Sequence, residues 1–264
     1  MKTYIIDSFT DTPFKGNPAG VCIVESDLSD KTMLSIAQEI NLSETAFIRP
    51  IGSDGIFSIR YFSPKMEIPL CGHATLASAR AVFSKYGLKE INFQNIQDLD
   101  LKVEVSENHI SMLFPIYETH DADVPSALLS ALGLESVLNT VYNEETKILM
   151  LEISSTEELS NLKPDFDALE KSHDAINGVL VTALSSEDEY DFHSRYFWPW
   201  SGTNEDPVTG GTHTFLANYW SQKLGKTKMK SFQSSKRSGF MEIELIGNKL
   251  RITSQAVIFL EGWI

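Results

Sequence analysis

The chain has 264 residues, 42% of them hydrophobic, a length that fits two domains of about 130 residues better than one. Its 36 acidic and 22 basic side chains give a formal net charge of -14, which argues against nucleic acid and anionic membrane as partners because both require a basic face. No apolar run approaches the roughly 20 residues that span a bilayer, and the first residues lack the apolar region of a signal peptide. We therefore expect a cytoplasmic protein that acts on a small molecule or binds another protein.

The first half of the chain alternates predicted helices with short strands. Ser29 or Asp30 can cap a helix that ends near Ile40, and an apolar strand follows it. Alternating runs typical of antiparallel strands occupy residues 57–61 and 102–105. A helix over about 73–86 carries small apolar residues around much of its circumference, which favours a helix enclosed by a curved sheet.

The second half begins after a polar segment, residues 117–125, that ends in Pro125. This segment is the predicted crossover between domains, and a bulkier helix is expected farther on, over about 212–224. The last strand, from Ala256 to Leu260, is expected to return to the first domain. The predicted domains are therefore residues 1–118, joined by 257–264, and residues 119–256.

The two halves repeat each other. Arg60-Tyr61-Phe62-Ser63-Pro64 reappears as Arg195-Tyr196-Phe197-Trp198-Pro199, and Glu67 to Gly72 is echoed by Glu205 to Gly210. Each copy then runs into a helical pattern that stops 15 residues after its last glycine, at Gly87 and Gly225. Phe93-Gln94 also pairs with Phe232-Gln233. A duplicated α+β chain of antiparallel meanders, with one cleft between two pseudo-symmetric halves, is the predicted architecture.

Each half has a glycine that leads into a helix. Free backbone N–H groups at such a helix start, together with the helix dipole, bind carboxylates and developing oxyanions. Duplication would face Gly72-His73 and Gly210-Gly211 across the cleft, which predicts a site for an anionic small molecule. The alternative is that each Pro-x-x-Gly segment is only a turn that starts a helix.

Glu44 lies where a helix is expected to end and an apolar strand to begin. If its carboxylate is partly desolvated, its pKa is expected to rise towards neutrality, which suits the removal and return of a proton by one group. The equivalent position of the second half is Val179, so the chain offers at most one such base. The alternative is an ordinary exposed glutamate in a turn.

Three further residues are candidates for the site. His73 stands in the first turn of its helix, where the dipole disfavours imidazolium, so a neutral ring is expected. Asp206, in the place of Ile68, can bond a substrate or cap its own turn. Cys71 precedes a helix start, which lowers a thiol pKa, although a small buried thiol is the commoner outcome. The alternatives are a structural role for His73 and a turn-capping role for Asp206.

The two cysteines, Cys22 and Cys71, are expected to be free thiols in a reducing compartment. No Cys/His cluster with the sequence spacing of metal ligands is present, so no metal is predicted.

The chain resembles the PhzF-like (phenazine biosynthesis) isomerase family. The matching segments run nearly end to end: Asp7-Ser8-Phe9, Phe14 to Val21, Asn41 to Thr45, Arg60 to Pro64, Pro69 to Thr75, Asp206 to Gly210, and Gln255 to Val257. The resemblance implies the diaminopimelate-epimerase-like fold, in which each domain wraps a sheet around a central helix. It also implies a cofactor-free enzyme, usually a homodimer, with its active site in the interdomain cleft.

The resemblance also implies roles for individual residues. Glu44 would be the acid/base, while His73 and Asp206 would hold the substrate. The remaining substrate-binding candidates are Asn17, Cys71, and the backbone donors at Gly72, Gly210 and Gly211. Gly211 stands where the family's pattern often has serine, so a hydroxyl donor is missing.

The predicted function is a proton shift on a small unsaturated carboxylate, of the trans-2,3-dihydro-3-hydroxyanthranilate isomerase type. Two alternatives remain open. Cys71-Gly72-His73 also resembles proline-racemase-like enzymes, and with Thr209 in place of their second cysteine the pair is compatible with an epimerase or dehydratase acting on an amino acid. The other alternative is a non-catalytic binding scaffold for a small molecule or protein.

Overall fold

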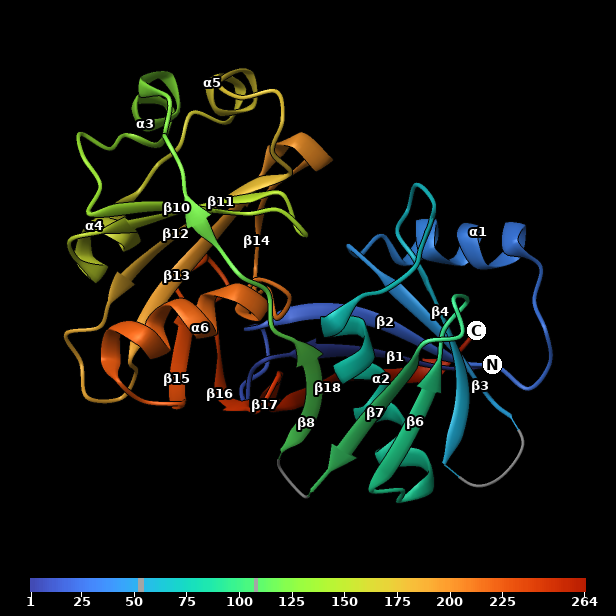
Figure 1. The fold of residues 1–264 in the computed structure, drawn as a ribbon. Helices are drawn as coiled ribbons and strands as arrows, with labels where there is room; N and C mark the ends of the chain where they lie inside the picture. The colour runs from blue at the N-terminus through green and yellow to red at the C-terminus, as the bar shows by residue number, and fades with distance from the viewer. Residues whose placement is uncertain (52–54, 107–108) are drawn as a thin grey trace. The chain divides into compact units, whose positions relative to one another are not determined.

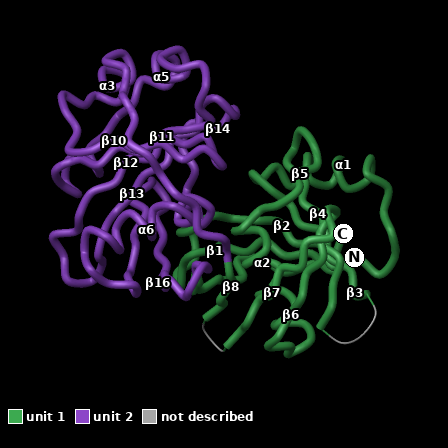
Figure 2. Tube along the Cα trace, viewed as in Figure 1, with its two compact units in different colours: residues 1–113, 251–264 green, residues 114–250 purple. Residues whose placement is uncertain are grey.

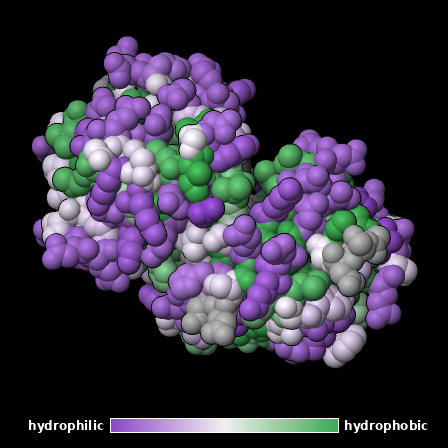
Figure 3. All heavy atoms as spheres, turned by 60° about the horizontal axis from the view of Figure 1, so that its bottom comes forward, coloured by the Kyte–Doolittle hydropathy of each residue, from purple (hydrophilic) through white to green (hydrophobic). Residues whose placement is uncertain are grey.

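The computed structural model describes residues 1–51, 55–106 and 109–264, which form two compact units. The first unit comprises residues 1–113 and 251–264, and the second comprises residues 114–250 (Figure 2). No helix in the described part of the chain is long and apolar enough to cross a membrane. On the face shown in Figure 3, hydrophilic residues cover much of the surface, with smaller hydrophobic areas between them.

The described part of the first unit combines helices with short strands (Figure 1). Its helices are α1 (Asp30–Ile40) and α2 (Gly72–Tyr86). Its strands are β1 (Lys2–Ser8), β2 (Asn17–Ile23), β3 (Thr45–Pro50), β4 (Ile56–Phe62), β5 (Glu67–Ile68), β6 (Glu90–Gln94), β7 (Asp100–Val105), β8 (Ile110–Pro115) and β18 (Ala256–Trp263). β18 pairs with β1 along its length, so the last strand of the chain lies beside the first.

The second unit has more helices than the first. They are α3 (Ser126–Leu132), α4 (Thr156–Asn161), α5 (Phe166–Lys171), the 3-10 turn η1 (Pro199–Ser201) and α6 (His213–Leu224). Its strands are β9 (His120–Asp121), β10 (Asn139–Asn143), β11 (Ile148–Ile153), β12 (Gly178–Leu184), β13 (Phe192–Trp198), β14 (Thr203–Asp206), β15 (Lys228–Gln233) and β16 (Gly239–Ile246). β17 (Lys249–Ser254) runs from the second unit into the first.

Strand pairing repeats between the units, as the duplicated sequence predicts. In the first unit β1–β2, β3–β4, β4–β5 and β6–β7 are antiparallel, while β2–β3 and β4–β6 are parallel. In the second unit β10–β11, β12–β13, β13–β14 and β15–β16 are antiparallel, while β11–β12 and β13–β15 are parallel. The meanders are thus mostly antiparallel, and each of these four parallel pairs is joined by a connection that contains a helix. β9 and β10 pair antiparallel although α3 lies between them in the sequence.

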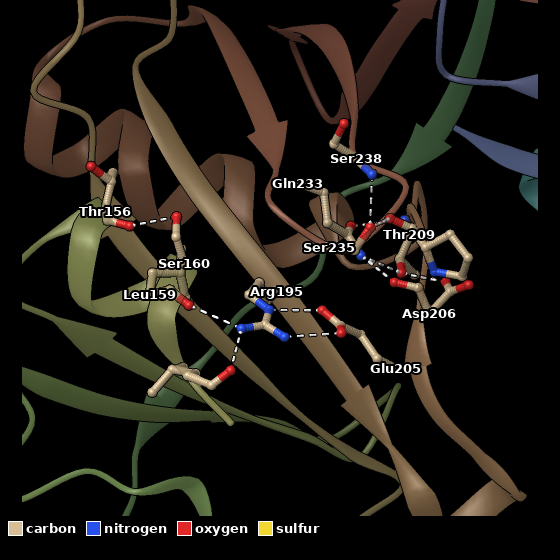
Figure 4. Close-up of polar contacts among 12 residues, drawn as sticks. Thr156, Leu159, Ser160, Arg195, Glu205, Asp206, Thr209, Gln233, Ser235 and Ser238 are labelled. Carbon is tan, nitrogen blue, oxygen red and sulfur yellow. Dashed lines mark hydrogen bonds and ion pairs between the residues drawn. The ribbon is translucent and has the colours of Figure 1, made fainter. Parts of the chain in front are cut away.

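The repeated Arg-Tyr-Phe motif has the same structural role in both units. Arg60 on β4 makes a bidentate ion pair with Glu67 on β5, at 2.7 and 2.6 Å. Arg195 on β13 pairs in the same way with Glu205 on β14, at 2.7 and 2.9 Å. Arg195 also donates to the carbonyls of α4, at Leu159 and just beyond it (Figure 4). Each pair braces the hairpin that leads to a Pro-x-x-Gly turn.

The central helices are buried for much of their length. Every residue of α2 from His73 to Ala79 is buried, and the helix contacts β1, β2, β3, β7 and β18. In α6 every residue from His213 to Ala217 is buried. Its Trp220 stacks on Phe192 and donates from Nε1 to the Thr182 hydroxyl at 3.1 Å. Helices with apolar residues all round need such enclosure, which agrees with the expectation for 73–86.

Candidate active site

Glu44 is held between α1 and β3 of the first unit. Ser29 caps α1 by accepting from the Thr32 N–H, and Asn41 ends the helix in the left-handed conformation with φ 54°. Three residues later the Gly20 N–H donates to the Glu44 carbonyl at 3.1 Å, which ties this segment to β2. The Glu44 side chain is only 14% exposed, so the exposed-turn alternative is wrong.

The Glu44 carboxylate contacts the start of α2. His73 Nε2 lies 3.2 Å from Glu44 Oε2, and the His73 side chain is 9% exposed. The Ser43 hydroxyl lies 3.4 Å from the same nitrogen, and Cys71 Sγ lies 3.4 Å from His73 Nδ1. Three residues that the sequence analysis selected separately therefore form one buried cluster of carboxylate, imidazole and thiol.

The ionisation of this cluster differs from the sequence-based expectation. Burial alone raises the pKa of Glu44, but the hydrogen bond and positive charge of His73 outweigh burial and lower that pKa below its usual value. Burial likewise opposes the imidazolium of His73, yet Cys71 and Glu44 raise the His73 pKa well above its usual value. The expected rise for Glu44 and the expected neutral His73 ring are both wrong. Both directions favour a carboxylate–imidazolium pair.

The Cys71 thiol shares this buried setting. Its pKa is raised by burial, which outweighs the lowering by neighbouring His73. Cys22 is also a free, buried thiol, with a pKa raised by desolvation to about 11. Although the chain lacks the sequence spacing of a metal site, ligand atoms of Glu44, Cys71 and His73 all lie within 4.8 Å of one another.

The start of α2 is fixed from two sides. The Ser8 hydroxyl on β1 donates to the His73 carbonyl at 2.8 Å, and the Thr75 hydroxyl donates to the Cys71 carbonyl at 2.7 Å. Asn17 pairs with Ser8 across β1 and β2 and is completely buried. Asn17 therefore lies on the strand next to the one that orients His73.

The second unit carries Asp206 and Thr209 in one tight turn (Figure 4). The Thr209 hydroxyl donates to Asp206 Oδ2. Gln233 on β15 spans the turn: its Nε2 donates to the Asp206 carbonyl at 2.7 Å, and its Oε1 accepts from the Thr209 N–H at 2.9 Å. The Ser235 hydroxyl donates to the Pro207 carbonyl. Asp206 thus joins a rigid turn.

The two glycine turns are not equivalent. Gly72 is the first residue of α2, as predicted. Gly210 and Gly211 instead belong to a turn, and α6 begins at His213, because the carbonyls of Gly210 and Gly211 accept from His213 and Thr214. The helix expected over about 212–224 is therefore confirmed to within one residue at its start, and Gly210 and Gly211 lie in the turn before it.

Sequence reasoning missed the residues that support the site. The sequence shows Gln233 only as part of the Phe232-Gln233 repeat. In the structure Gln233 bonds the Asp206 carbonyl, whereas its counterpart Gln94 bonds the Asp100 side chain. His213 bonds the Thr209 carbonyl through Nδ1 and the Ser231 hydroxyl through Nε2, at 3.1 and 2.9 Å. The sequence signal for the contact with Thr209 is that His213 stands four residues after it.

Comparison with known proteins identifies the family. The model of the phenazine biosynthesis-like protein family, PhzC-PhzF, matches residues 6–262. The chain belongs to the PhzC-PhzF family. A Rattus norvegicus phenazine biosynthesis-like domain-containing protein is 39% identical, with 100% of this chain and 99% of the relative covered. A Pseudomonas aeruginosa relative named as an isomerase is 38% identical, covering 99% and 98%. The predicted family is confirmed.

Solved structures agree with the fold. A PhzF-family protein of Enterococcus faecalis superposes with a TM-score of 0.91 and 35% identity, covering 100% of this chain and 99% of the other. An Agrobacterium radiobacter protein described as a probable proline racemase has a TM-score of 0.63 at 9% identity, covering 100% of this chain and 92% of the other, and shares the fold alone. The predicted α+β, epimerase-like fold class is confirmed.

Proposed function

We propose that this PhzC-PhzF protein is an isomerase that shifts a proton on a small unsaturated carboxylate, with Glu44 as the shuttle. The buried contact between Glu44 and His73 carries this proposal. A substrate of the trans-2,3-dihydro-3-hydroxyanthranilate type is the specific candidate. The family membership and the relatives named as isomerases support this reaction class.

The ion pair explains how one group can both take and return a proton. The carboxylate of Glu44 is ionised at neutral pH and is ready to remove a proton from a carbon next to the unsaturated acid. Once Glu44 is protonated, its attraction to the imidazolium of His73 is lost, so the complex favours giving the proton back. His73 therefore keeps Glu44 from retaining the proton.

Other groups of the proposed site would bind the substrate. Asp206 is the proposed second substrate-holding side chain, and its orientation is limited by the Thr209 hydroxyl and by Gln233. The backbone at Gly72, at the start of α2, is a proposed donor to a substrate carboxylate. These assignments follow the family resemblance.

The amino-acid epimerase or dehydratase remains a less supported reading. It needs Cys71 as a thiolate, whereas burial raises the pKa of that thiol. It also needs Thr209 at the reacting carbon, whereas the Thr209 hydroxyl is bonded to Asp206. Loss of activity in Cys71→Ser but not in Glu44→Gln would favour it over the proton shuttle.

The test is incubation with trans-2,3-dihydro-3-hydroxyanthranilate in D2O, following absorbance and deuterium incorporation. We expect turnover with label in the wild type and in Glu39→Gln, which neutralises an exposed glutamate on α1. Glu44→Gln should lose about 100-fold or more in rate because it removes the general base. Undiminished turnover in Glu44→Gln would refute the shuttle, and no turnover by any variant would refute this substrate.

A further inference from the structure

We propose that Glu44, Cys71 and His73 form a binding site for a thiophilic divalent cation, and that zinc is the ion that fits it. Binding would occupy the proposed shuttle, so zinc would inhibit the isomerase reversibly. The inhibition rests on the proposed function, whereas the binding rests only on the three side chains.

The separations of the ligand atoms match those around zinc. Zinc–ligand bonds of about 2.0–2.3 Å in a tetrahedral site place pairs of ligand atoms about 3.3–3.8 Å apart. Glu44 Oε2 and His73 Nε2 are 3.2 Å apart, and His73 Nε2 and Cys71 Sγ are 3.9 Å apart. All three ligand atoms lie within 4.8 Å of one another, so small side-chain shifts bring each into contact with one ion.

The donor set selects the class of ion. A thiolate and an imidazole favour zinc over magnesium or calcium, which prefer oxygen ligands. Three protein ligands leave a fourth position of the tetrahedron for water or a substrate oxygen. Binding displaces the protons of the Cys71 thiol and of the His73 ring, and the ion then takes the place of the imidazolium charge beside Glu44.

The backbone already holds the ligands in position. Cys71 and His73 flank the first residue of α2, and the carbonyls of both accept hydrogen bonds from the Thr75 and Ser8 hydroxyls. Glu44 is fixed through its own carbonyl by Gly20. Little ordering of the chain is therefore needed when the ion binds, which favours affinity.

The chain offers two matched controls. Cys22 is also a buried free thiol, and its Sγ accepts from the Thr3 hydroxyl at 3.7 Å. His120 and Glu144 form another histidine–carboxylate pair, 3.7 Å apart, but both side chains are exposed and the pair belongs to no ligand group that includes a cysteine in the described chain. Cys22→Ser and His120→Gln therefore remove one ligand type each without touching the proposed site.

Calorimetric titration of reduced, chelator-treated protein with zinc chloride tests the proposal without a substrate. We expect one zinc ion per chain, binding at least about tenfold more weakly in Cys71→Ser and in His73→Gln, and unchanged binding in both controls. Magnesium chloride should give no binding. Cobalt(II) in the wild type should give the near-ultraviolet charge-transfer band of a cobalt–thiolate bond, and Cys71→Ser should lose it.

Two outcomes would overturn the proposal: zinc binding that Cys71→Ser leaves unchanged, or a cobalt spectrum of the wild type without the thiolate band. If Cys71→Ser fails to fold by circular dichroism, the wild-type cobalt spectrum decides alone. Zinc binding without isomerase turnover would refute the proposed function only, and turnover without zinc binding would refute this proposal only.

Discussion

At the scale of single residues, burial and charge compete at Glu44 and His73. Burial would raise the pKa of an isolated carboxyl, and the adjacent imidazolium reverses that effect. Burial would lower the pKa of His73 because its charged form is costly to bury, and its neighbours raise that pKa instead. Both signs depend on a contact between residues 29 positions apart, so a sequence reading that treated each residue alone predicted them wrongly.

The first prediction concerns His73→Gln. His73 makes the main contribution that lowers the pKa of Glu44, so without the imidazolium burial raises that pKa. The base must be ionised, and the acid limb of kcat/KM should therefore move to higher pH in the variant, with a rate loss of about 100-fold at neutral pH. A pH–rate profile of both proteins measures this, and an unmoved acid limb would show that His73 does not set the ionisation of Glu44.

The second prediction concerns Gly211→Ser, which restores the hydroxyl common in the family's pattern. A Cβ at Gly211 meets nothing within 4 Å, so we expect unfolding free energy to be unchanged or to rise by about 0.4–1 kcal/mol. Turnover of the dihydro-hydroxyanthranilate should increase. Gly16→Ser is the steric control, because φ there is +66° and a Cβ would lie 2.0 Å from the Ser8 carbonyl oxygen. A lower free energy of unfolding in Gly211→Ser would contradict the open space found around Gly211.

At the scale of elements, strand β15 positions the turn that carries Asp206. Gln233 donates to one end of that turn and accepts from the other. The pseudo-equivalent Gln94 on β6 instead bonds Asp100 in an exposed hairpin, and Asn95 holds the Pro69 carbonyl of the first turn. The two units therefore support their glycine turns with different side chains, Gln233 at the end of β15 and Asn95 just after β6.

The third prediction follows from this difference. Gln233→Leu leaves the Thr209 N–H and the Asp206 carbonyl without their partner, which should lower the free energy of unfolding by about 2–4 kcal/mol. Gln94→Leu should lower it by less than about 1 kcal/mol, since its bond is exposed to water. Chemical denaturation measures both. Faster amide exchange at Thr209 in Gln233→Leu alone would assign the effect to the turn, and equal losses in the two variants would contradict it.

Much of the element-scale structure was predictable from local patterns. Ser29, Gly87 and Gly225 marked the helix ends α1, α2 and α6, because capping and left-handed C-caps depend on nearby residues only. The repeated Arg-Tyr-Phe and glutamate motifs predicted two pseudo-symmetric halves. The role of Gln233 was not predictable, because it depends on hydrogen bonds between segments distant in the sequence.

At the scale of the whole molecule, a buried histidine makes stability depend on pH. His213 is 1% exposed, and burial lowers its pKa to about 4. The unfolded chain binds this proton below about pH 6.5, whereas the folded chain excludes it until about pH 4. The stability from the neutral ring is therefore complete above pH 6.5 and is lost as the pH falls towards 4.

The fourth prediction is that His213→Gln removes this dependence. The wild type should lose about 3 kcal/mol of unfolding free energy from this group between pH 6.5 and pH 4, and the variant should not. Urea denaturation of both proteins at the two pH values isolates the difference, since the other titrating groups are common to them. Parallel losses in the two proteins would show that His213 is not the group responsible.

The central claim is that Glu44 and His73 rest as a carboxylate–imidazolium pair, ready to move a proton. Nitrogen-15 NMR of histidine-labelled, metal-free protein tests it directly, with the His73 signals assigned by their loss in His73→Gln. We predict that both ring nitrogens of His73 are protonated at pH 7 in the wild type. A neutral ring at pH 7, with one bare nitrogen, would contradict the ion pair and the shuttle built on it.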